Sequence, residues 1–454
     1  MASLRAPTVA GTFYPSDPVA LGHMLAGFTA TDGAAARPYK AIIAPHAGYP
    51  YSGPIAGTAY AAIRHLAPQI RRVVLLGPTH RFGFHGIAAP SEDGLVTPLG
   101  VVPVDRPALD SVMALPGLQV LDAAFAGEHA LEVHLPFLQH VLGEFAVVPL
   151  LVGSTAPQLV AAVLERLWGG PETLIVVSSD LSHYQPYDAA RQTDLGTSQA
   201  IEALQGDRLS GERACGFLPI AGLLLRAAAL DLRVTTLDLR TSGDTSGERS
   251  QVVGYGAYGF EEAASARLSD EHRQCLLDAA RQGLAHAAAT GEALTVTPED
   301  YPLPLRALRA SFVTLTQAGQ LRGCIGTILP GSPLVADVVQ NAFRAAMHDP
   351  RFGAITREEV GRTDISVSIL SHPRPMAITG TADLLAQLRP HVDGLILLDG
   401  SHQSLFLPSV WEMLPDPALF VAHLKQKAGL PPHHDSANLQ AFRFTTETFP
   451  NAPK

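Results

Sequence analysis

The segment at residues 40–53 constrains the fold of this chain more than any other. Its apolar run at residues 41–44 is too short for a helix and is closed by Pro45 and two glycines, so it predicts a buried strand. His46 follows this strand almost directly. Because ligands of open α/β sheets bind beyond the carboxyl ends of the strands, we expect His46 to face a ligand there.

Two further strands are expected to end in the same way. Residues 72–78 form an apolar run that a Gly-Pro break closes just before His80. A third apolar run leads into Asp180 and His183. If these strands lie side by side in a parallel sheet, the three loops meet at one edge, and a shared polar or metal site is expected there. The alternative is that each histidine is an ordinary loop or core residue.

The order of the expected elements indicates the fold class of the first domain. Strands alternate with helices, which predicts an α/β fold with a mixed, largely parallel sheet flanked by helices over residues 1–262. A fourth strand at residues 233–239 runs into a Gly-rich loop that contains Asp244. Two imidazoles and one carboxylate with open positions form the facial triad of non-haem Fe(II) sites.

A second domain is expected to follow a short linker. Residues 263–270 read as the linker, in which Ser269 is a credible N-cap for a long helix. Residues 271–454 contain a hairpin near residues 311–328 and then mix strands with helices. We therefore predict an α+β second domain with antiparallel strands.

Composition excludes several classes of function. The formal net charge is −10 and no cluster of Lys or Arg stands out, which disfavours a nucleic-acid surface. The three cysteines are far apart and form no CxxC, which fits a reducing compartment. No signal peptide is read, and the most apolar long stretch, at residues 218–230, is too short to span a bilayer. We expect a cytoplasmic protein without a membrane segment.

A second cluster of metal-ligating side chain types lies at His129, Glu132 and His134. The spacing HxxExH differs by one residue from the zinc-protease motifs HExxH and HxxEH. On a helix, His129 and Glu132 share a face while His134 is turned away. We therefore expect supporting roles for this cluster rather than direct metal ligation. The alternative is a capped helix start whose histidine faces the substrate.

Four strings in the first domain together resemble the Memo family across about residues 5–260. They are Ala-Pro-His46-Ala-Gly-Tyr49, Leu-Gly-Pro-Thr-His80, Glu128-His-Ala-Leu-Glu-Val-His134-Leu-Pro-Phe and Ser-Ser-Asp180-Leu-Ser-His183. This family is similar in fold to class III extradiol dioxygenases. The resemblance implies that His46 and His80 are metal ligands and that His183 is an acid/base residue.

The resemblance also implies a third metal ligand. In animal Memo proteins it is a cysteine, which we expect in the loop before the last strand. That loop, at residues 241–247, has no cysteine here, so Asp244 is the best replacement. Fe(II) is the favoured ion, with Cu and Zn as alternatives. The other candidate residues are Asp180 and His129, expected in catalytic roles, and Tyr49, Glu132 and His134, expected near the ligands or the substrate.

The second domain resembles the AMMECR family over about residues 272–450. The matching strings are Leu321-Arg-Gly-Cys-Ile-Gly326, His348-Asp-Pro-Arg-Phe352 and residues 364–370. In a strand, Arg322 and Cys324 point to one face, where the guanidinium would lower the pKa of the thiol. The alternative is that Cys324 is a small buried residue. Arg322, His348 and Arg351 are candidates for a pocket that holds an anionic group.

Together the two halves resemble the AmmeMemoRadiSam group, in which both accompany a radical-SAM protein. The chain resembles a fusion of the two accessory parts, and its sequence has no CxxxCxxC cluster motif. We therefore expect a metal-dependent redox enzyme with a dioxygenase-like site that acts on a small molecule. One alternative is a non-catalytic metal-binding adaptor that works with a radical-SAM partner. A second alternative is a metal-dependent hydrolase.

Overall fold

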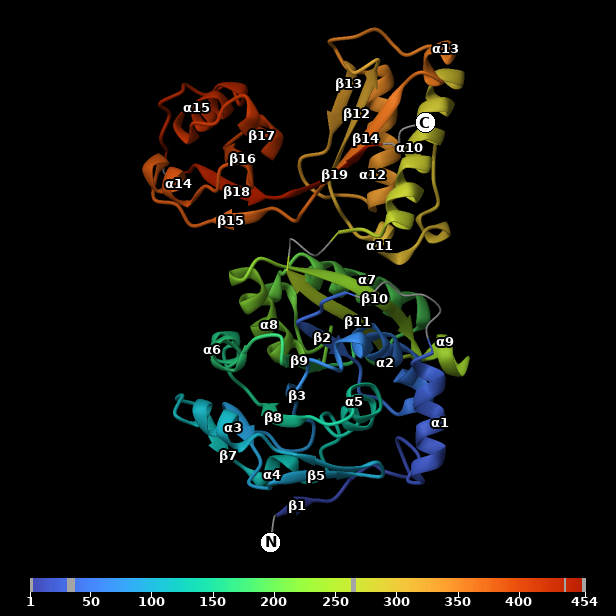
Figure 1. Cartoon of the computed structure of the whole chain (residues 1–454), viewed down its shortest axis with the longest axis vertical. Coiled ribbons are helices and arrows are strands. Elements are labelled where there is room, and N and C mark those ends of the chain that lie inside the picture. Colours follow the sequence, from blue (N-terminus) through green and yellow to red (C-terminus); the bar gives the residue numbers. More distant parts are fainter. Residues whose placement is uncertain (1–2, 31–36, 263–266, 437, 451–454) are drawn as a thin grey trace. The chain divides into compact units, whose positions relative to one another are not determined.

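The computed structural model describes residues 3–30, 37–262, 267–436 and 438–450 (Figure 1). The chain divides into a first unit that ends at Arg267 and a second that begins at Leu268. Residues 263–266 of the expected linker lie outside the described residues. Among the described residues, no helix combines the length and the apolar character needed to cross a membrane.

The first unit is built on an eight-stranded sheet with the order β10-β11-β2-β9-β3-β8-β4-β7. The strands β2, β9, β3 and β8 pair in parallel, while β10 and β11 are antiparallel. A small three-stranded sheet, β1-β5-β6, completes the unit. The bounds are β1 Leu4–Arg5, β2 Ala41–Ala44, β3 Arg72–Pro78, β4 Ile87–Ala89, β5 Gly94–Thr97, β6 Gly100–Pro103, β7 Leu118–Val120, β8 Ala146–Val152, β9 Thr173–Ser178, β10 Leu232–Thr241 and β11 Gly254–Glu262.

Helices flank the large sheet (Figure 1). Helix α2 contacts β2, β10 and β11, and α8 contacts β3, β9 and β10. The α/β prediction with a mixed, largely parallel sheet is therefore confirmed. The bounds are α1 Pro18–Phe28, α2 Tyr49–Ile63, α3 Arg106–Met113, α4 Asp122–Phe125, α5 His134–Leu142, α6 Pro157–Leu167, α7 Tyr187–Glu202, α8 Phe217–Ala229 and α9 Ser242–Ser246.

The central strands explain why the site can form. All residues of β2 and β9 are buried, and β3 is buried from its second residue on. Strands covered on both faces read as continuous apolar runs, which is the pattern seen in the sequence. Because β9 lies between β2 and β3 and all three run in parallel, their carboxyl ends meet at one edge.

The segment with the HxxExH spacing does not form the helix on which His129 and Glu132 would share a face. Helix α5 begins only at His134, and the residues before it form turns. The cause is Glu128, whose carboxylate accepts the backbone N–H groups of His129 and Ala130 at 2.9 Å each. These bonds hold the backbone in a turn, so His129 and Glu132 do not share a helix face.

The second unit consists of two four-stranded antiparallel sheets with helices, which confirms the α+β prediction. Ser269 caps α10, since its hydroxyl accepts the N–H of His272 at 3.2 Å. The sheet order is β13-β12-β14-β19 in one sheet and β15-β18-β16-β17 in the other. The bounds are α10 Asp270–Thr290, α11 Leu303–Arg306, β12 Ser311–Gln317, β13 Gln320–Gly326, α12 Leu334–Met347, α13 Arg357–Val360, β14 Asp364–Leu370, β15 Arg374–Met376, α14 Thr381–Gln387, β16 Gly394–Asp399, β17 His402–Phe406, α15 Pro417–Lys427, β18 Gln440–Phe444 and β19 Thr446–Pro450.

Candidate metal centre

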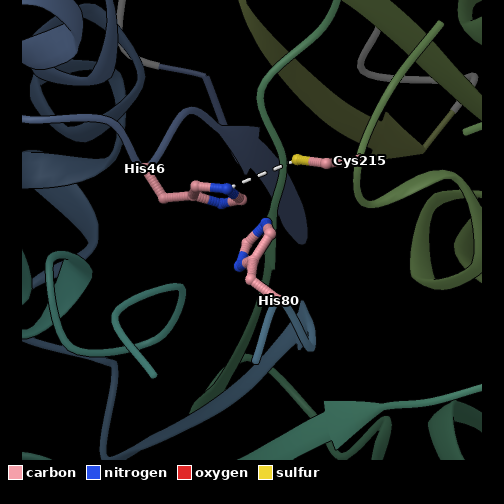
Figure 2. Close-up of side chains that lie close together, drawn as sticks. All are labelled: His46, His80 and Cys215. Atoms are coloured by element: carbon pink, nitrogen blue, oxygen red, sulfur yellow. Dashed lines mark hydrogen bonds between the residues drawn. The ribbon is translucent and has the colours of Figure 1, made fainter. Parts of the chain in front are cut away.

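Two histidines and a cysteine converge at the carboxyl edge of the large sheet. His46 follows β2, His80 follows β3, and Cys215 lies just before α8. Each offers one ligand atom, and these three atoms lie within 4.8 Å of one another. Figure 2 shows the three side chains facing a common point. The arrangement brings together nitrogen and sulfur donors from three loops that are distant in the sequence.

The ring of His46 is buried and its orientation is fixed. Its Nδ1 lies 2.6 Å from the hydroxyl of Ser178, which itself donates to the carbonyl of Ala130 at 2.6 Å. Because the hydroxyl has only one proton, it accepts from His46 Nδ1–H, and Nε2 keeps a free lone pair. Burial, together with His80 and His129, holds the pKa of His46 well below its ordinary value. The ring is therefore neutral, which is the form that binds metals.

A buried carboxylate holds His80. Glu128 accepts the backbone N–H of His80 at 2.6 Å and faces its Nδ1 at 2.9 Å. Burial alone would raise the pKa of Glu128, but the hydrogen bonds from His80 and from Ala130 outweigh it and lower this pKa to about 2. An ionised Glu128 only accepts hydrogen bonds, so Nδ1 of His80 carries the proton. In Figure 2 the other ring nitrogen points towards His46 and Cys215.

The thiol of Cys215 completes the group. Its Sγ lies 3.3 Å from Nε2 of His46, and the backbone N–H of Asp180 donates to Sγ at 3.3 Å. Burial and the nearby charge of Asp180 raise the pKa of the thiol to about 12. The thiol is therefore protonated without a cation, and a metal ion would have to displace that proton.

A glycine allows Cys215 to come this close to the sheet. The backbone N–H of Gly216 donates to the hydroxyl of Ser179 at 2.9 Å. A Cβ at Gly216 would lie 2.5 Å from the carbonyl oxygen of Ser178. Only a residue without a side chain fits against β9 there, so Gly216 sets the position of the preceding cysteine.

A third imidazole lies beside the group. The ring of His129 stacks on that of His80, with centroids 4.9 Å apart and an interplanar angle of 20°. Its centroid is 5.5 Å from that of His46. His80, Glu128 and His129 also offer ligand atoms within 4.8 Å of one another. Since Glu128 already accepts several N–H groups, this second set is better suited to supporting His80.

The loop after β9 adds a buried acid and a histidine. Asp180 is buried, accepts the N–H of His46 at 2.8 Å, and has its pKa raised by burial. His183 is half-buried, and its Nδ1 lies 2.8 Å from the carbonyl of Leu181. Nδ1 must be the donor in that contact, so Nε2 of His183 is free to accept a proton.

Asp244, which we expected as the third ligand, is in neither group of candidate ligands among the described residues. Its carboxylate accepts the N–H of Thr241 at 2.8 Å and forms the capping box of α9. It also accepts the hydroxyl of Tyr187 at 2.5 Å. The carboxylate is therefore used within this short helix, because an acidic side chain at its third position accepts the backbone N–H of the N-cap residue.

The remaining first-unit candidates hold the structure around the site. Tyr49 is buried and donates its hydroxyl to the carbonyl of Val133 at 2.7 Å. Glu132 accepts the N–H of Val9 at 2.8 Å and so anchors the N-terminal segment. His134 is buried, with Nδ1 2.6 Å from the hydroxyl of Tyr60.

Of the second-unit candidates, Arg351 donates to the carbonyl of Cys324 at 3.3 Å, whereas Arg322 and His348 have other partners. Arg322 pairs with Glu359 at 3.1 Å and donates to the carbonyl of Gly353, so its guanidinium already has an acidic partner. Cys324 is half-buried, and its Sγ accepts the hydroxyl of Thr314 at 3.3 Å. The exposed Arg351 pairs with Asp349 at 2.7 Å, and the ring of His348 packs edge-on against Phe343.

Comparisons with known proteins agree with the division into two units. The family model for Memo-like proteins matches residues 5–258, and the AMMECR1 model matches residues 277–449. A MEMO1 family protein of Aquifex aeolicus is 37% identical over 267 residues, covering 56% of this chain and 97% of its own length. One from Methanothermobacter thermautotrophicus is 34% identical over 276 residues, covering 56% and 98%. A solved structure of an uncharacterized protein from Pyrococcus horikoshii is 30% identical and covers 41% of this chain and 94% of its own, with a TM-score of 0.38.

Proposed function

The chain belongs to the Memo family, and from this premise we propose that its first unit is a metal-dependent redox enzyme acting on a small molecule. The ion would be held by His46, His80 and Cys215. One observation carries this proposal: three ligand atoms from separate loops lie within 4.8 Å of one another. The proton on Nδ1 of each histidine is already used by a buried acceptor, which leaves Nε2 for the ion.

The donor set fits a divalent transition metal. Two neutral imidazoles and one thiol that becomes a thiolate suit Fe(II), Cu and Zn, whereas Mg²⁺ and Ca²⁺ prefer oxygen. Cys215 takes the place in the ligand set that we expected Asp244 to fill. Three protein ligands leave room for a substrate, as catalytic sites do. When bound, the ion would supply Lewis acidity and, as Fe or Cu, one-electron redox chemistry.

The chain's own groups would position the substrate and move a proton. Glu128 and Ser178 keep the two imidazoles turned towards the common point. His183 would act as the general base, because its free Nε2 can take a proton from a substrate hydroxyl. Asp180 would hold the loop of His183 against His46, and His129 would form a wall of the site beside His80.

A second candidate function is a non-catalytic metal-binding adaptor for a radical-SAM partner. Asp180 favours it, because Oδ2 of that residue lies 3.9 Å from Nε2 of His46. His129, stacked on His80, lies close as well. If either closed the coordination of the ion, no position would remain for a substrate.

Reconstitution with single metals separates these functions. The protein would be loaded anaerobically with Fe(II), Cu or Zn, and oxygen uptake would be followed with a panel of oxidisable phenols and thiols. We expect turnover with Fe or Cu, and a decrease of roughly 10²- to 10⁴-fold in His183→Gln with the metal retained. Tight metal binding without turnover would support the adaptor instead. Hydrolysis of the corresponding phenyl esters by the Zn-loaded protein, without oxygen uptake, would support a hydrolase.

A further inference from the structure

We propose that the cavity beside Cys215 is a pocket for a compact, uncharged and largely apolar small molecule. This inference rests on the proposed function, because it names the class of substrate that the metal centre would receive. The argument uses the position of the cavity, the makeup of its walls and the charges of the residues that line it.

The cavity opens at the carboxyl edge of β3 and β8 and at the start of α8. Its volume is about 390 Å³, within the range typical of small-molecule sites. It is lined by Pro78, Thr79, Gly83, Phe84, His85, Val152, Gly153, Ser154, Cys215, Phe217, Leu218 and Pro219. The cavity is therefore at the same edge of the sheet as the candidate metal centre.

Cys215 connects the cavity with the metal centre. This residue lines the cavity, and its Sγ lies 3.3 Å from Nε2 of His46. Phe217, two residues further along, opens α8 and forms another part of the wall. A molecule in the cavity would thus contact the same short segment that contributes the sulfur ligand. His46, His80 and His183 are not among the lining residues, so such a molecule would approach the metal centre from the side of Cys215.

The walls of the cavity are mostly apolar. Phe84 and Phe217 contribute rings, while Val152 and Leu218 contribute aliphatic side chains. The hydroxyl of Thr79 is engaged, since it donates to the carbonyl of Phe82 at 2.8 Å. Such walls favour a molecule that buries apolar surface.

The ring of Phe84 depends on a glycine for its place in the wall. A Cβ at Gly153 would lie 2.4 Å from the carbonyl oxygen of Phe84 and 2.9 Å from its ring. Any other residue at this position would push Phe84 away. The close packing of Gly153 against Phe84 therefore fixes the position of the aromatic ring in the wall.

The lining residues include no Asp, Glu, Lys or Arg. In the metal-free protein, a charged molecule entering such a pocket would lose its hydration without gaining a carboxylate, ammonium or guanidinium partner, which is unfavourable. The formal net charge of −10 further disfavours anions. The pocket therefore favours uncharged molecules over charged ones.

A pair of probes that differ in charge tests this inference. 2-Naphthol and 2-naphthoate have the same bicyclic body, but only the second is ionised at neutral pH. Binding would be measured by fluorescence titration of the full chain, metal-free and loaded with Co(II). In the metal-free chain we expect 2-naphthol to bind at least about tenfold more tightly than 2-naphthoate. It should also shift the absorption spectrum of the Co(II)-loaded protein.

A variant that fills the cavity tests whether 2-naphthol binds there. Gly83 lines it, and a Cβ there meets no atom within 4 Å, so the Cβ of Gly83→Trp causes no clash and we expect its ring to fill the space. We expect this variant to lose at least about tenfold in affinity for 2-naphthol while it keeps its metal affinity. Gly27→Trp is the matched control, because Gly27 is exposed in α1 and its Cβ also meets open space.

The outcomes distinguish the pocket proposal from the proposal of a metal site. Equal binding of the two probes would overturn the pocket proposal, and so would unchanged 2-naphthol binding by Gly83→Trp. If the metal binds but 2-naphthol does not, the pocket proposal fails and the metal claim stands. If no metal binds, yet 2-naphthol binds selectively and Gly83→Trp removes that binding, the pocket stands and the proposed function fails.

Discussion

Each candidate metal-binding histidine is oriented by one buried acceptor. The hydroxyl of Ser178 accepts from His46, and the carboxylate of Glu128 accepts from His80. Such contacts fix the tautomer and turn the second nitrogen towards the ion. Metal affinity should therefore depend on residues that never touch the ion.

The first prediction concerns Glu128→Gln. The amide keeps the size of the side chain but removes the negative charge that holds His80, so metal affinity should fall by roughly 10- to 100-fold. Competition with a coloured chelator measures the change. Glu144→Gln, at an exposed position, serves as the control and should bind as the wild type does. Equal affinities for the two variants would contradict this role of Glu128.

The second prediction concerns pH. Asp194 is buried, and burial raises the pKa of its carboxyl to about 6 in the folded state. A carboxyl whose pKa is raised on folding lowers stability as pH rises from its unfolded pKa of roughly 4 to its folded pKa. Asp194→Asn keeps the acceptor for the N–H of Ser182 but cannot ionise.

The free energy of unfolding of Asp194→Asn, taken relative to that of the wild type, should therefore rise by on the order of 2–3 kcal/mol between about pH 4 and pH 7. Urea unfolding of both proteins at the two pH values gives this difference. A difference that does not change with pH would show that the pKa of Asp194 is the same in the folded and unfolded states, and it would contradict this prediction.

Residue types alone could predict His46 and His80 but not Cys215. Both histidines follow an apolar strand, and the strand ends locate the ligand edge. Cys215 precedes a helix and follows no strand, so nothing in the local pattern marks it as a ligand. The one available signal was its neighbour Gly216, since a Cys-Gly pair before an apolar helix allows a close backbone approach.

At the scale of elements, the loop before α8 positions the sulfur. It lies against the end of β9, where the N–H of Cys215 donates to the carbonyl of Asp180 at 3.3 Å. Gly216 makes this approach possible. The candidate metal centre therefore depends on close contact between the loop and the strand.

The third prediction concerns Gly216→Ala. The added methyl group would overlap the carbonyl oxygen of Ser178, so the loop must shift and carry Cys215 away from His46. We expect at least about a tenfold loss of metal affinity, measured by isothermal titration calorimetry, with a near-native circular dichroism spectrum. Gly211→Ala is the control in the same loop, because its Cβ would meet atoms only at 3.7 Å or more. Equal metal binding by both variants would argue against the close approach.

The central strands were predictable as elements, whereas their order was not. Continuous apolar runs mark β2, β3 and β9 as buried strands. The pairing of β9 between β2 and β3 joins residues more than 100 positions apart, and no local pattern encodes it. The turn before α5 could not be predicted either. It depends on the buried carboxylate of Glu128, which accepts a backbone N–H group there.

At the scale of the whole molecule, the two units have separate cores. The core of the first unit ends with Phe260, and the next core begins with Leu276. The family models also match the two parts separately, at residues 5–258 and 277–449. A domain with its own core can in principle fold alone.

The fourth prediction follows from these separate cores. A fragment of residues 1–267 should fold, bind one metal ion, and melt within about 3 °C of the corresponding transition in the full chain, since it keeps its whole core. Differential scanning calorimetry and metal analysis measure both properties. Aggregation of the fragment, or loss of its metal, would mean that the second unit supports the first.

The absorption spectrum of the Co(II)-loaded protein tests the central claim most directly. A thiolate ligand gives an intense charge-transfer band in the near ultraviolet, and a carboxylate ligand does not. We predict one bound Co(II) ion with this band in the wild type, loss of the band in Cys215→Ser, and an unchanged spectrum in Asp244→Ala. An unchanged spectrum in Cys215→Ser, together with loss of the metal in Asp244→Ala, would contradict the His46, His80 and Cys215 site.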